Sequence, residues 1–366
     1  MTDIGRMHVE LTGRLDTTDA IRAAFADHPR HHYIPDLVWP DPQGLPLIRT
    51  ANPQRWASYV YDDDSVVTQA NDGGSGLVNT PSSSSSAPQL MADMIEAAGV
   101  EPGMRVLEIG TGTGWNAAIL ASLVGPTGHV TSLEIDPDVA AHARDRLSGS
   151  GVRVVPGIEV PDDVVYDAVI ATCAVSRVPP AWIEQARPEA SLIVPWGPYS
   201  GSHASPVAAL RKTGPKSAAG PFVCEAYFMR DRTQRVPVGE FPGMGRESET
   251  TRVVPFTPED LVTDDRLVRF LLMLPGVRIG TGVRPFNGDR GRIVYLGAPD
   301  SSWAYLWPDG SVHGGGPTPL AERLRETHAL LAGEGWPELD EFSLAVDTSG
   351  EECRVRTRFG TWEHRV

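Results

Sequence analysis

The sequence predicts an α/β fold in which a parallel sheet is covered by helices on both faces. Between residues 104 and 197, short apolar runs alternate with segments of helical periodicity, the pattern of repeated strand–helix–strand units. A glycine-rich turn, GTGTG at residues 110–114, follows the first of these runs. The composition changes near residue 235, where VPVGEFPGMGRESETT is typical of a linker. We therefore expect two domains, residues 1–235 and a smaller α+β domain over residues 236–366.

The composition is that of a globular protein with an acidic surface. Of its 366 residues, 41% are hydrophobic and 22% are charged, which suffices for one large and one small core. The formal net charge of −15 disfavours a nucleic acid as the main partner, because binding phosphates requires a basic face. The chain opens without a basic segment followed by an apolar run, and no run approaches the roughly 18 apolar residues that span a bilayer. We expect a cytoplasmic protein without a membrane partner.

Neither the cysteines nor the histidines form a pattern typical of a metal site. The three cysteines are odd in number, lie far apart and form no CxxC, so we expect core thiols. His28, His31 and His32 lie close together, but no downstream carboxylate or cysteine follows at ligand spacing. No metal is expected.

Two helices are predicted before the alternating region. The first lies within residues 17–39, opened by Thr17 or Thr18 as N-cap and stopped by the prolines of the loop HPRHHYIPDLVW. Residues 40–88 are rich in Pro, Asp, Gly and Ser and end in NTPSSSSSAP. Apolar residues then recur at helical spacing from Leu90 to Ala98 and stop at Gly99. The serine run therefore leads into a packed helix, with a mobile loop as the alternative for residues 82–84.

The alternating region and the chain after it supply the remaining elements in order. Strands are predicted in MRVLEIG, HVTSLEID, VRVVPG, YDAVIATC and SLIVPWG, and helices in NAAILASLVG, PDVAAHARDRL and PAWIEQA. PVAALRK and FVCEAYFMR predict an antiparallel hairpin that extends the sheet over residues 206–230. The smaller domain is predicted to hold a helix in DDRLVRFLLML, a hairpin around Pro308–Gly310, a helix in TPLAERLRETHALLAG, and closing strands in FSLAVD and CRVRTRF.

The segment VLEIGTGTGWNAA, residues 106–118, predicts a cofactor site at the end of the first strand. Gly110, Gly112 and Gly114 let the backbone approach a ligand where any Cβ would collide. A dinucleotide fingerprint would have its third glycine at position 115, which is Trp here, so the spacing favours a cofactor without a pyrophosphate. Glu134, about 20 residues beyond the last glycine, is placed to accept hydrogen bonds from both ribose hydroxyls of an adenosyl group. A nicotinamide enzyme and a relic fold remain the alternatives.

Together with Glu108 and Glu134, this turn resembles the cofactor motif of class I S-adenosylmethionine methyltransferases. Three further segments resemble the protein-L-isoaspartate O-methyltransferase family. SAPQLMADMIEAAG, residues 86–99, is similar to the family's segment in which Ser-x-Pro opens a helix; HPRHHYIP resembles its Pro-Arg-x-x-Phe-Val-Pro element, and SLIVPWG its strand ending in Val-Pro-x-Gly. The resemblance covers about residues 15–235. It implies a Rossmann-like class I S-adenosylmethionine methyltransferase fold, to which a small α+β C-terminal domain is added.

The resemblance implies a carboxyl O-methyltransferase that uses S-adenosylmethionine and releases S-adenosylhomocysteine. An aspartyl carboxylate is ionised at neutral pH and needs no general base, so catalysis reduces to positioning the acceptor oxygen. Hydroxyls and helix-start amides bind such an anion without a salt bridge that would weaken its nucleophilicity. Ser86 matches the position of the family's catalytic serine, and Ser85 and Ser84 are the second candidates.

The remaining expected site residues surround these two segments. The expected cofactor contacts are Glu108, Gly110, Thr111, Gly112, Gly114, Trp115, Glu134, Ile135, Gly157, Ile158, Glu159 and Ala171. The expected peptide contacts are Ser86, Pro88, Thr172, Cys173, Val194, Pro195 and Trp196. The family commonly has Gly-Asp-Gly after the third strand, where this chain has residues 156–159, so Glu159 is the candidate to replace the aspartate that contacts the adenine amine.

Three segments resemble those of actinobacterial methyltransferases that are encoded with ATP-grasp peptide maturases: VVTQANDGG, the serine run and YLGAPDSSWAYLWPDG. Methyltransferases of this group act on ω-ester-linked ribosomal peptides called graspetides. This resemblance implies methylation of an aspartate in a macrocyclic precursor peptide, leading to an aspartimide or isoaspartate. A lanthipeptide-associated methyltransferase, a general isoaspartate repair enzyme and a non-catalytic peptide-binding scaffold remain as alternatives.

The C-terminal extension is expected to recognise the peptide substrate. Its aromatic side chains form either a recognition surface or the core of a small domain: Phe286, Trp303, Tyr305, Trp307 and Trp336. If they recognise the peptide, deleting residues 240–366 should leave cofactor binding intact and abolish action on the precursor.

Overall fold

The computed structural model describes residues 3–41, 44–76, 78–197, 204–235, 247–262, 266–349 and 352–365. The chain divides into two compact units. Unit 1 consists of Met1–Cys173, Pro180–Val194 and Arg211–Pro215, and unit 2 of Ala174–Pro179, Pro195–Leu210 and Lys216–Val366. This division differs from the boundary expected at residue 235, because residues 216–235 belong to the same unit as the C-terminal strands. Most of the predicted linker, residues 236–246, lies outside the described residues.

Five parallel strands form the main sheet of unit 1. Their order is β7-β6-β5-β8-β9, with the bounds β5 (Arg105–Ile109), β6 (His129–Glu134), β7 (Arg153–Pro156), β8 (Tyr166–Ala171) and β9 (Ala186–Pro195). The strand order reverses on either side of β5, so the loops after β5 and β8 flank a crevice of the kind in which open α/β sheets bind ligands. The predicted α/β fold is confirmed.

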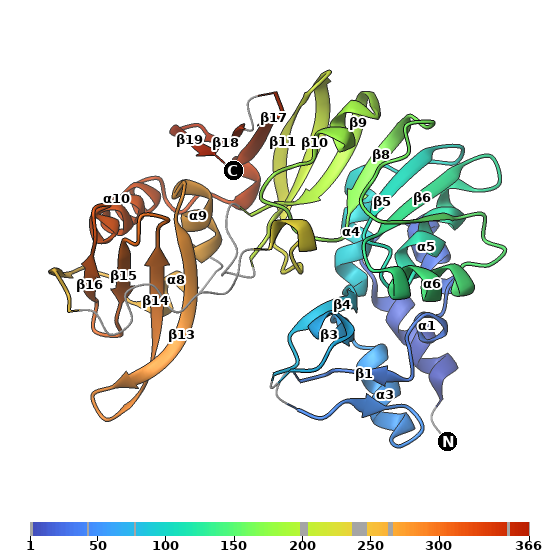
Figure 1. The fold of residues 1–366 in the computed structure, drawn as a ribbon, viewed down its shortest axis with the longest axis horizontal. Helices are drawn as coiled ribbons and strands as arrows, with labels where there is room; N and C mark the ends of the chain where they lie inside the picture. The colour runs from blue at the N-terminus through green and yellow to red at the C-terminus, as the bar shows by residue number, and fades with distance from the viewer. Residues whose placement is uncertain are drawn as a thin grey trace. The chain divides into compact units, whose positions relative to one another are not determined.

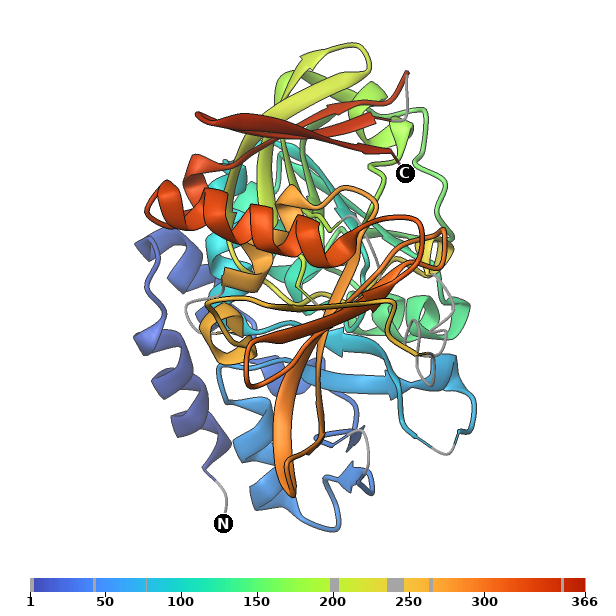
Figure 2. The ribbon, with the colours of Figure 1, turned by 90° about the vertical axis from the view of Figure 1, so that its left-hand side faces the viewer.

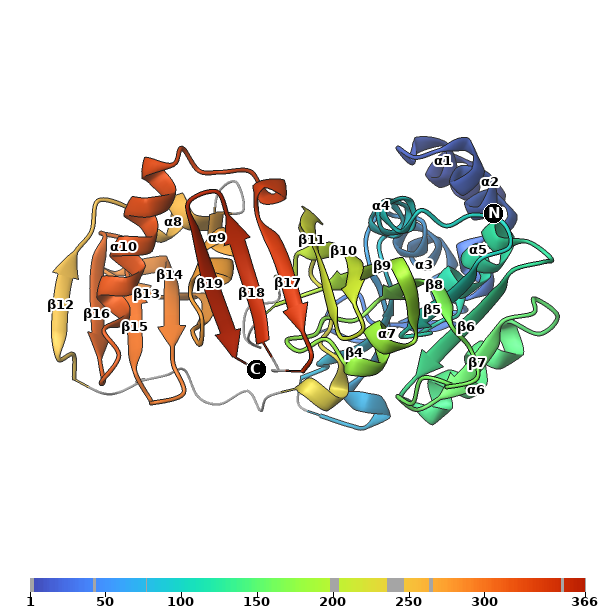
Figure 3. The same cartoon turned by 90° about the horizontal axis from the view of Figure 1, so that it is seen from above.

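The helices of unit 1 follow the predicted order. They are α4 (Pro88–Ala98), α5 (Trp115–Val124), α6 (Pro137–Arg146) and α7 (Pro180–Glu184), preceded by α2 (Asp19–Asp27). Helix α5 is buried along most of its length because α2 packs against it as well as β6 (Figure 3). Thr18 caps α2 by accepting a hydrogen bond from the amide of Ile21, and α4 ends at Gly99 with φ +64°, as expected for a glycine C-cap.

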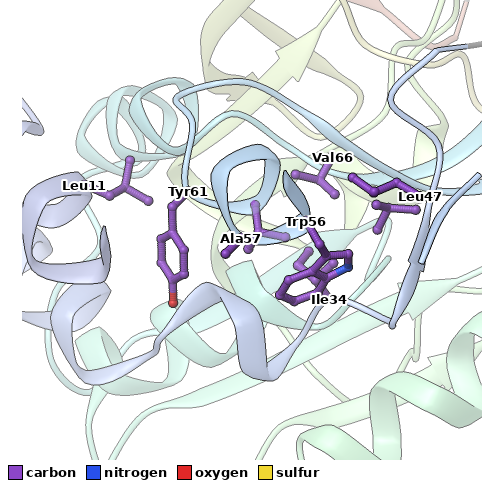
Figure 4. Close-up of a cluster of buried hydrophobic side chains, with 9 residues drawn as sticks. Leu11, Ile34, Leu47, Trp56, Ala57, Tyr61 and Val66 are labelled. Atoms are coloured by element: carbon purple, nitrogen blue, oxygen red, sulfur yellow. The ribbon is translucent and has the colours of Figure 1, made fainter. Parts of the chain in front are cut away.

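The N-terminal residues build a small core of their own. Its elements, drawn in blue in Figure 1, are α1 (Ile4–Arg14), η1 (Arg30–His32), β1 (Leu37–Val38), β2 (Leu47–Ile48), α3 (Pro53–Val60) and β3 (Val66–Ala70). The indole of Trp56 is fully buried and lies beside Ile34 in this core (Figure 4). The turn-rich composition of residues 40–88 did not indicate α3, because proline at the first position of a helix also reads as a turn signal.

The serine run forms a strand, which corrects the mobile-loop alternative. Strand β4 (Pro81–Ser85) pairs antiparallel with β3, with Val66 opposite Ser85 and irregular register between Val67 and Ala70. Serine has no strong strand preference, so the sequence pattern alone favoured a loop. The expectation that this run leads into a packed helix is confirmed, since α4 begins three residues after β4 ends.

Unit 2 contains an antiparallel arrangement of strands at the C-terminus. The order is β10-β11-β17-β18-β19, with the bounds β10 (Val207–Gly214), β11 (Ser217–Cys224), β17 (Ser343–Asp347), β18 (Glu352–Thr357) and β19 (Gly360–Arg365). Strand β10 begins in this unit and ends in unit 1. The predicted hairpin over residues 206–230 corresponds to β10 and β11. Fully buried aromatic side chains pack beside these strands, Trp196 against Phe222 with ring centroids 6.2 Å apart.

A second antiparallel sheet of unit 2 has the order β12-β16-β15-β14-β13. Its strands are β12 (Thr250–Val253), β13 (Arg278–Phe286), β14 (Asp289–Gly297), β15 (Trp303–Leu306) and β16 (Ser311–Gly315), with β13 and β14 forming the long hairpin in Figure 1. Helix α10 (Leu320–Gly333) packs on β15 and β16 (Figure 2), and α8 (Pro258–Val262) contacts β14 and α9 (Arg266–Met273). The sequence pattern did not indicate the β13–β14 hairpin.

Two of the aromatic residues in this sheet belong to a core. Trp303 and Tyr305 are 5% and 8% exposed and form a buried cluster with Ile293. For these two residues the structure favours core packing over a recognition surface. None of the helices that the structure describes is both long and apolar enough to cross a bilayer.

Candidate active site

The glycine turn after β5 has a backbone that only glycine adopts without strain. Gly110, Gly112 and Gly114 have φ values of +96°, +52° and +84°. A Cβ on Gly110 would lie 2.6 Å from Oγ1 of Thr172, and one on Gly112 would lie 3.2 Å from the carbonyl oxygen of Ser84. These glycines therefore let the loop after β8 and the serine strand approach the turn. The turn and the serine run, far apart in the sequence, are neighbours in the structure.

Glu134 ends β6 beside this turn. Its Oε2 accepts a hydrogen bond from the amide of Gly112 at 2.8 Å, and its Oε1 accepts one from the amide of Asp136 at 3.0 Å. The amide of Gly157 donates to the backbone carbonyl oxygen of Glu134 at 2.7 Å, so the loop after β7 adjoins the end of β6. The next residue, Ile158, is 51% exposed. The pairing of glycine turn and acidic strand end that the sequence predicts is present in the structure.

Glu108 supports the turn from behind and is fully buried. Its Oε1 accepts from Nδ2 of Asn116 at 2.8 Å and its Oε2 accepts from Oγ of Ser132. The Ser132 hydroxyl also bonds Oγ1 of Thr111 at 2.6 Å. Burial raises the pKa of Glu108 to about 7, although the bonds from Ser132 and Asn116 act in the opposite direction. Glu108 has no exposed surface, and hydrogen bonds connect it to Asn116 directly and to Thr111 through Ser132.

The turn and the serines line one pocket. The lining residues come from the end of the serine run, the glycine turn, the first turns of α4 and α5 and the loop after β8: Ser84, Ser85, Ser86, Met91, Gly110, Thr111, Thr113, Trp115, Asn116 and Thr172. The cavity measures about 20 Å³, room for about one water molecule. Met91, Thr113 and Asn116 were not assigned from the sequence, although the last two stand inside the motif at residues 106–118.

Arg30 lies behind the serines and was not assigned from the sequence either. Its guanidinium is fully buried and donates to the carbonyl oxygens of Ser85 and Ser86 at 3.0 and 2.8 Å and to Oγ of Ser85 at 3.2 Å. It also lies 5.1 Å from the centre of the Trp115 ring. Burial lowers the pKa of Arg30 to about 10, so the side chain remains charged at neutral pH. The Pro-Arg pair in HPRHHYIP was the signal that points to it.

Several expected contacts are not among the residues that line this pocket. Five of the expected peptide contacts do not line it: Pro88, Cys173, Val194, Pro195 and Trp196. Trp196 is fully buried in unit 2, where its Nε1 donates to the carbonyl oxygen of Ser176 at 2.9 Å. Among the expected cofactor contacts, Ala171 is fully buried at the end of β8 and Ile135 is half-buried beside Glu134.

The doubly wound sheet, the glycine turn after its first strand and the acid at the end of the second define a class I methyltransferase fold. The family model described as protein-L-isoaspartate(D-aspartate) O-methyltransferase matches residues 50–221. A protein-L-isoaspartate O-methyltransferase of Pyrococcus abyssi is 30% identical over 185 residues, which cover 49% of this chain and 71% of the relative. The chain belongs to the protein-L-isoaspartate O-methyltransferase family.

The aligned segments cover a smaller share of other relatives. The chain spans about half the length of two further proteins of the same name. The one from Ignicoccus hospitalis is 42% identical over 116 residues, which cover 30% of this chain and 55% of the relative. The one from Thermotoga maritima is 33% identical over 184 residues, which cover 49% of this chain and 50% of the relative. A solved structure named protein-L-isoaspartate O-methyltransferase aligns over 97% of this chain and 99% of its own, with a TM-score of 0.55 and 23% identity. At that identity the likeness shows the fold alone, and it covers both units. A second unit is therefore not peculiar to this chain.

Proposed function

We propose that this chain is an S-adenosylmethionine-dependent O-methyltransferase that esterifies an aspartyl-type carboxylate, such as that of an isoaspartyl residue, in a peptide or protein. The observation that carries the proposal is the pocket that the glycine turn and Ser84–Ser86 line together. The turn is suited to the methyl donor and the serines to the acceptor. Membership of the protein-L-isoaspartate O-methyltransferase family supports the same reaction.

The residues around the turn fit S-adenosylmethionine. We infer that Glu134, which two backbone amides hold, binds the ribose hydroxyls. The exposed side chain of Ile158 is suited to cover an adenine ring, with Glu159 next to it in the sequence. Oδ1 of Asn116 is buried without a hydrogen-bond partner. Leaving such an acceptor unpaired costs about 1–3 kcal/mol, so a donor group on a ligand in this pocket would stabilise it. The bound cofactor supplies an electrophilic methyl group.

The chemistry of the pocket favours a carboxylate acceptor over an alcohol or an amine. Hydroxyl and ammonium acceptors must lose a proton before or during methyl transfer and therefore need a general base. None of the described residues that line the pocket is a His, Lys, Asp or Glu. An ionised carboxylate needs only to be held in line with the methyl group and shielded from water.

Among the three serines, Ser86 is best placed to hold the acceptor. The side chain of Ser85 is buried and a hydrogen bond from Arg30 holds its Oγ, so this hydroxyl keeps a proton to donate but is less free to turn toward an acceptor. Ser86 lies between the end of β4 and the start of α4 and contributes its carbonyl oxygen, not its hydroxyl, to the bond with Arg30. We infer that the Ser86 hydroxyl donates to one acceptor oxygen. Ser84 remains the second candidate.

The reaction class is tested with three short peptides that differ only at the acceptor, which is isoaspartate, aspartate or asparagine. The full chain and S-adenosylmethionine should add one methyl group to a peptide that carries the carboxylate and none to the asparagine peptide, as read by mass spectrometry. Methylation of the asparagine peptide, or of no peptide although calorimetry detects cofactor binding, would contradict the proposed acceptor. Absence of cofactor binding would favour a non-catalytic peptide-binding scaffold.

For the physiological substrate, we propose an aspartate in a macrocyclic ribosomal peptide of the graspetide type. The resemblance of the serine run and the segment at residues 295–310 to graspetide-associated methyltransferases supports it. After esterification, the next backbone nitrogen attacks the ester carbonyl: a C–N bond forms, the C–O bond breaks, and methoxide leaves as methanol with the amide proton. The product is an aspartimide, which persists or opens to isoaspartate.

Incubating the chain with a cyclised precursor should therefore show gain of a methyl group followed by loss of methanol. A linear isoaspartyl peptide is the matched control, because a repair enzyme accepts it efficiently. Turnover of the linear peptide alone would favour general isoaspartate repair, which is consistent with the names of the relatives. Turnover of a lanthionine-containing precursor alone would favour the lanthipeptide-associated alternative. Recognition of the precursor by residues 236–366 is part of the same proposal.

A further inference from the structure

Arg30 is a buried cation that makes no ion pair with a carboxylate among the residues the structure describes, although the exposed carboxylates of Asp63 and Asp64 attract it through space. Its guanidinium is fully buried, and every hydrogen bond that it donates ends on a carbonyl oxygen or on the Ser85 hydroxyl. The carbonyl acceptors belong to Val60, Asp62, Asp64, Ser85 and Ser86. The aspartates of that loop have exposed side chains and make no ion pair with Arg30.

This cation stands directly behind the acceptor side of the pocket. Three of its hydrogen bonds end on Ser85 and Ser86, and its other neighbour, Trp115, also lines the pocket. The positive charge is therefore separated from the pocket by a single layer of protein. Arg30 itself does not line the pocket, so an acceptor bound there does not meet the guanidinium.

Burial makes this charge effective at a distance. Inside a protein the effective dielectric constant is far below that of water, so a charge one residue layer away changes the affinity for an anion by about tenfold or more. A direct ion pair would instead hold the acceptor oxygen and reduce its nucleophilicity. A cation behind the serines attracts the carboxylate while leaving its oxygen free to react.

Resting on the proposed function, we propose that Arg30 selects an anionic acceptor by its charge: it attracts the carboxylate from behind Ser85 and Ser86 without touching it. In the reaction an acceptor oxygen bonds to the methyl carbon, and the carbon–sulfur bond breaks with its electron pair left on sulfur. The negative acceptor and the positive sulfonium become a neutral ester and a neutral thioether. The attraction by Arg30 is thus largest before reaction and fades along it, so its charge lowers the acceptor KM and does not raise kcat.

The test compares Arg30→Lys, which keeps the charge, with Arg30→Gln, which removes it, using an isoaspartyl peptide. Arg30→Gln should raise the acceptor KM by at least about tenfold with kcat within about threefold of wild type, and Arg30→Lys should restore KM to within about threefold. Arg14→Gln is the matched control, because Arg14 donates to the carbonyl oxygen of Tyr61 from an exposed position, and it should change neither constant.

A purely structural role predicts a different result. Lysine replaces at most three of the hydrogen bonds of Arg30, so both variants would then lose kcat to a similar extent. Equal loss in the two variants, or a loss of kcat without a change in KM, would overturn the inference. Calorimetry with S-adenosylhomocysteine shows whether each variant keeps a folded cofactor site. A wild-type chain that methylates no peptide overturns the proposed function. An active wild type whose Arg30→Gln and Arg30→Lys variants have the same acceptor KM overturns only the role of Arg30.

A measurement on the wild-type chain covers the case in which the variants do not fold. Two peptides that carry aspartate or asparagine at the acceptor position compete with the isoaspartyl peptide at about 0.05 M and about 0.5 M salt. The aspartate peptide should inhibit at least about tenfold better at both concentrations, because a buried charge is screened little by salt. Equal inhibition, or a preference that disappears at the higher concentration, would overturn the inference.

Discussion

Glu108 carries a carboxyl group that the fold keeps away from water, and its titration is the most direct property to measure at the scale of a residue. Burial raises the pKa of Glu108 from 4.5 to about 7. The folded chain thus favours the protonated form, and the stability that this provides is fully present below pH 4.5 and is lost as the pH rises to about 7.

Glu108→Gln replaces this group by one that does not titrate. Between about pH 5 and pH 8 the free energy of unfolding of the wild type should fall relative to that of the variant, by on the order of 3 kcal/mol for a shift of this size. Chemical denaturation of both proteins at the two pH values measures the difference. A difference that stays constant with pH would show that Glu108 titrates normally and is not desolvated.

Residues with a local signature were predictable from the sequence, and residues defined by distant partners were not. Glu108, Gly110 and Glu134 stand at fixed spacings in a strand–turn–helix segment, so their positions follow from the motif. Arg30 acquires its role only because folding brings it against Ser85, 55 positions away. Asn116 was visible within the motif, but its unpaired oxygen is a property of three-dimensional packing.

At the scale of elements, the glycine turn is the segment whose backbone conformation decides the site. Gly110→Ala places a Cβ 2.6 Å from Oγ1 of Thr172 at a φ of +96°. The turn must shift, so we expect at least about a tenfold loss of affinity for S-adenosylhomocysteine by calorimetry, and a loss of stability of about 1–3 kcal/mol.

Gly125→Ala is the matched control for the turn. Gly125 also has a positive φ, +65°, and follows the same helix α5, but a Cβ there meets nothing within 4 Å. With its ψ of −170°, Gly125 has a backbone conformation that is essentially restricted to glycine, so the variant should lower stability by about 1–3 kcal/mol while leaving cofactor affinity unchanged. Equal losses of affinity in the two variants would show that the contact with Thr172 is unimportant.

The serine strand shows why some elements escaped sequence-based prediction. Five serines carry no alternation of apolar and polar residues, which is the usual signal of a strand. Strand β4 forms because it pairs with β3 and because Arg30 donates hydrogen bonds to the carbonyl oxygens of Ser85, its last residue, and of Ser86, which follows it. Helix α4 directly after it was predictable, since its apolar spacing and Gly99 are local.

At the scale of the whole molecule, the compact units do not end where the composition changes. The boundary expected near residue 235 marks a polar stretch of sequence, whereas compactness depends on contacts such as the pairing of β11 with β17, which lies more than 100 residues later. Phe222 donates its backbone amide to Phe342 at 3.0 Å, and the Trp196 ring lies 5.1 Å from that of His364.

Deleting residues 240–366 should therefore damage the rest of unit 2. It removes β17 from β11 and exposes Phe222 and Trp196, whose burial each stabilises the fold by several kcal/mol. The truncated chain should aggregate or lose its near-ultraviolet circular dichroism, in contrast to the simple expectation of lost precursor recognition alone. A monodisperse truncated chain with an unchanged spectrum would contradict this account of the unit.

The central claim is that Ser86 and the glycine turn serve one reaction in one pocket, and single-turnover methyl transfer to an isoaspartyl peptide tests it most directly. Ser86→Ala should slow methyl transfer by about tenfold to a hundredfold, which corresponds to the free energy of one lost hydrogen bond to a charged group. The affinity for S-adenosylhomocysteine should stay within about threefold of wild type. Ser83→Ala, in strand β4 and outside the pocket lining, should transfer at the wild-type rate. An unchanged rate in Ser86→Ala would contradict the claim.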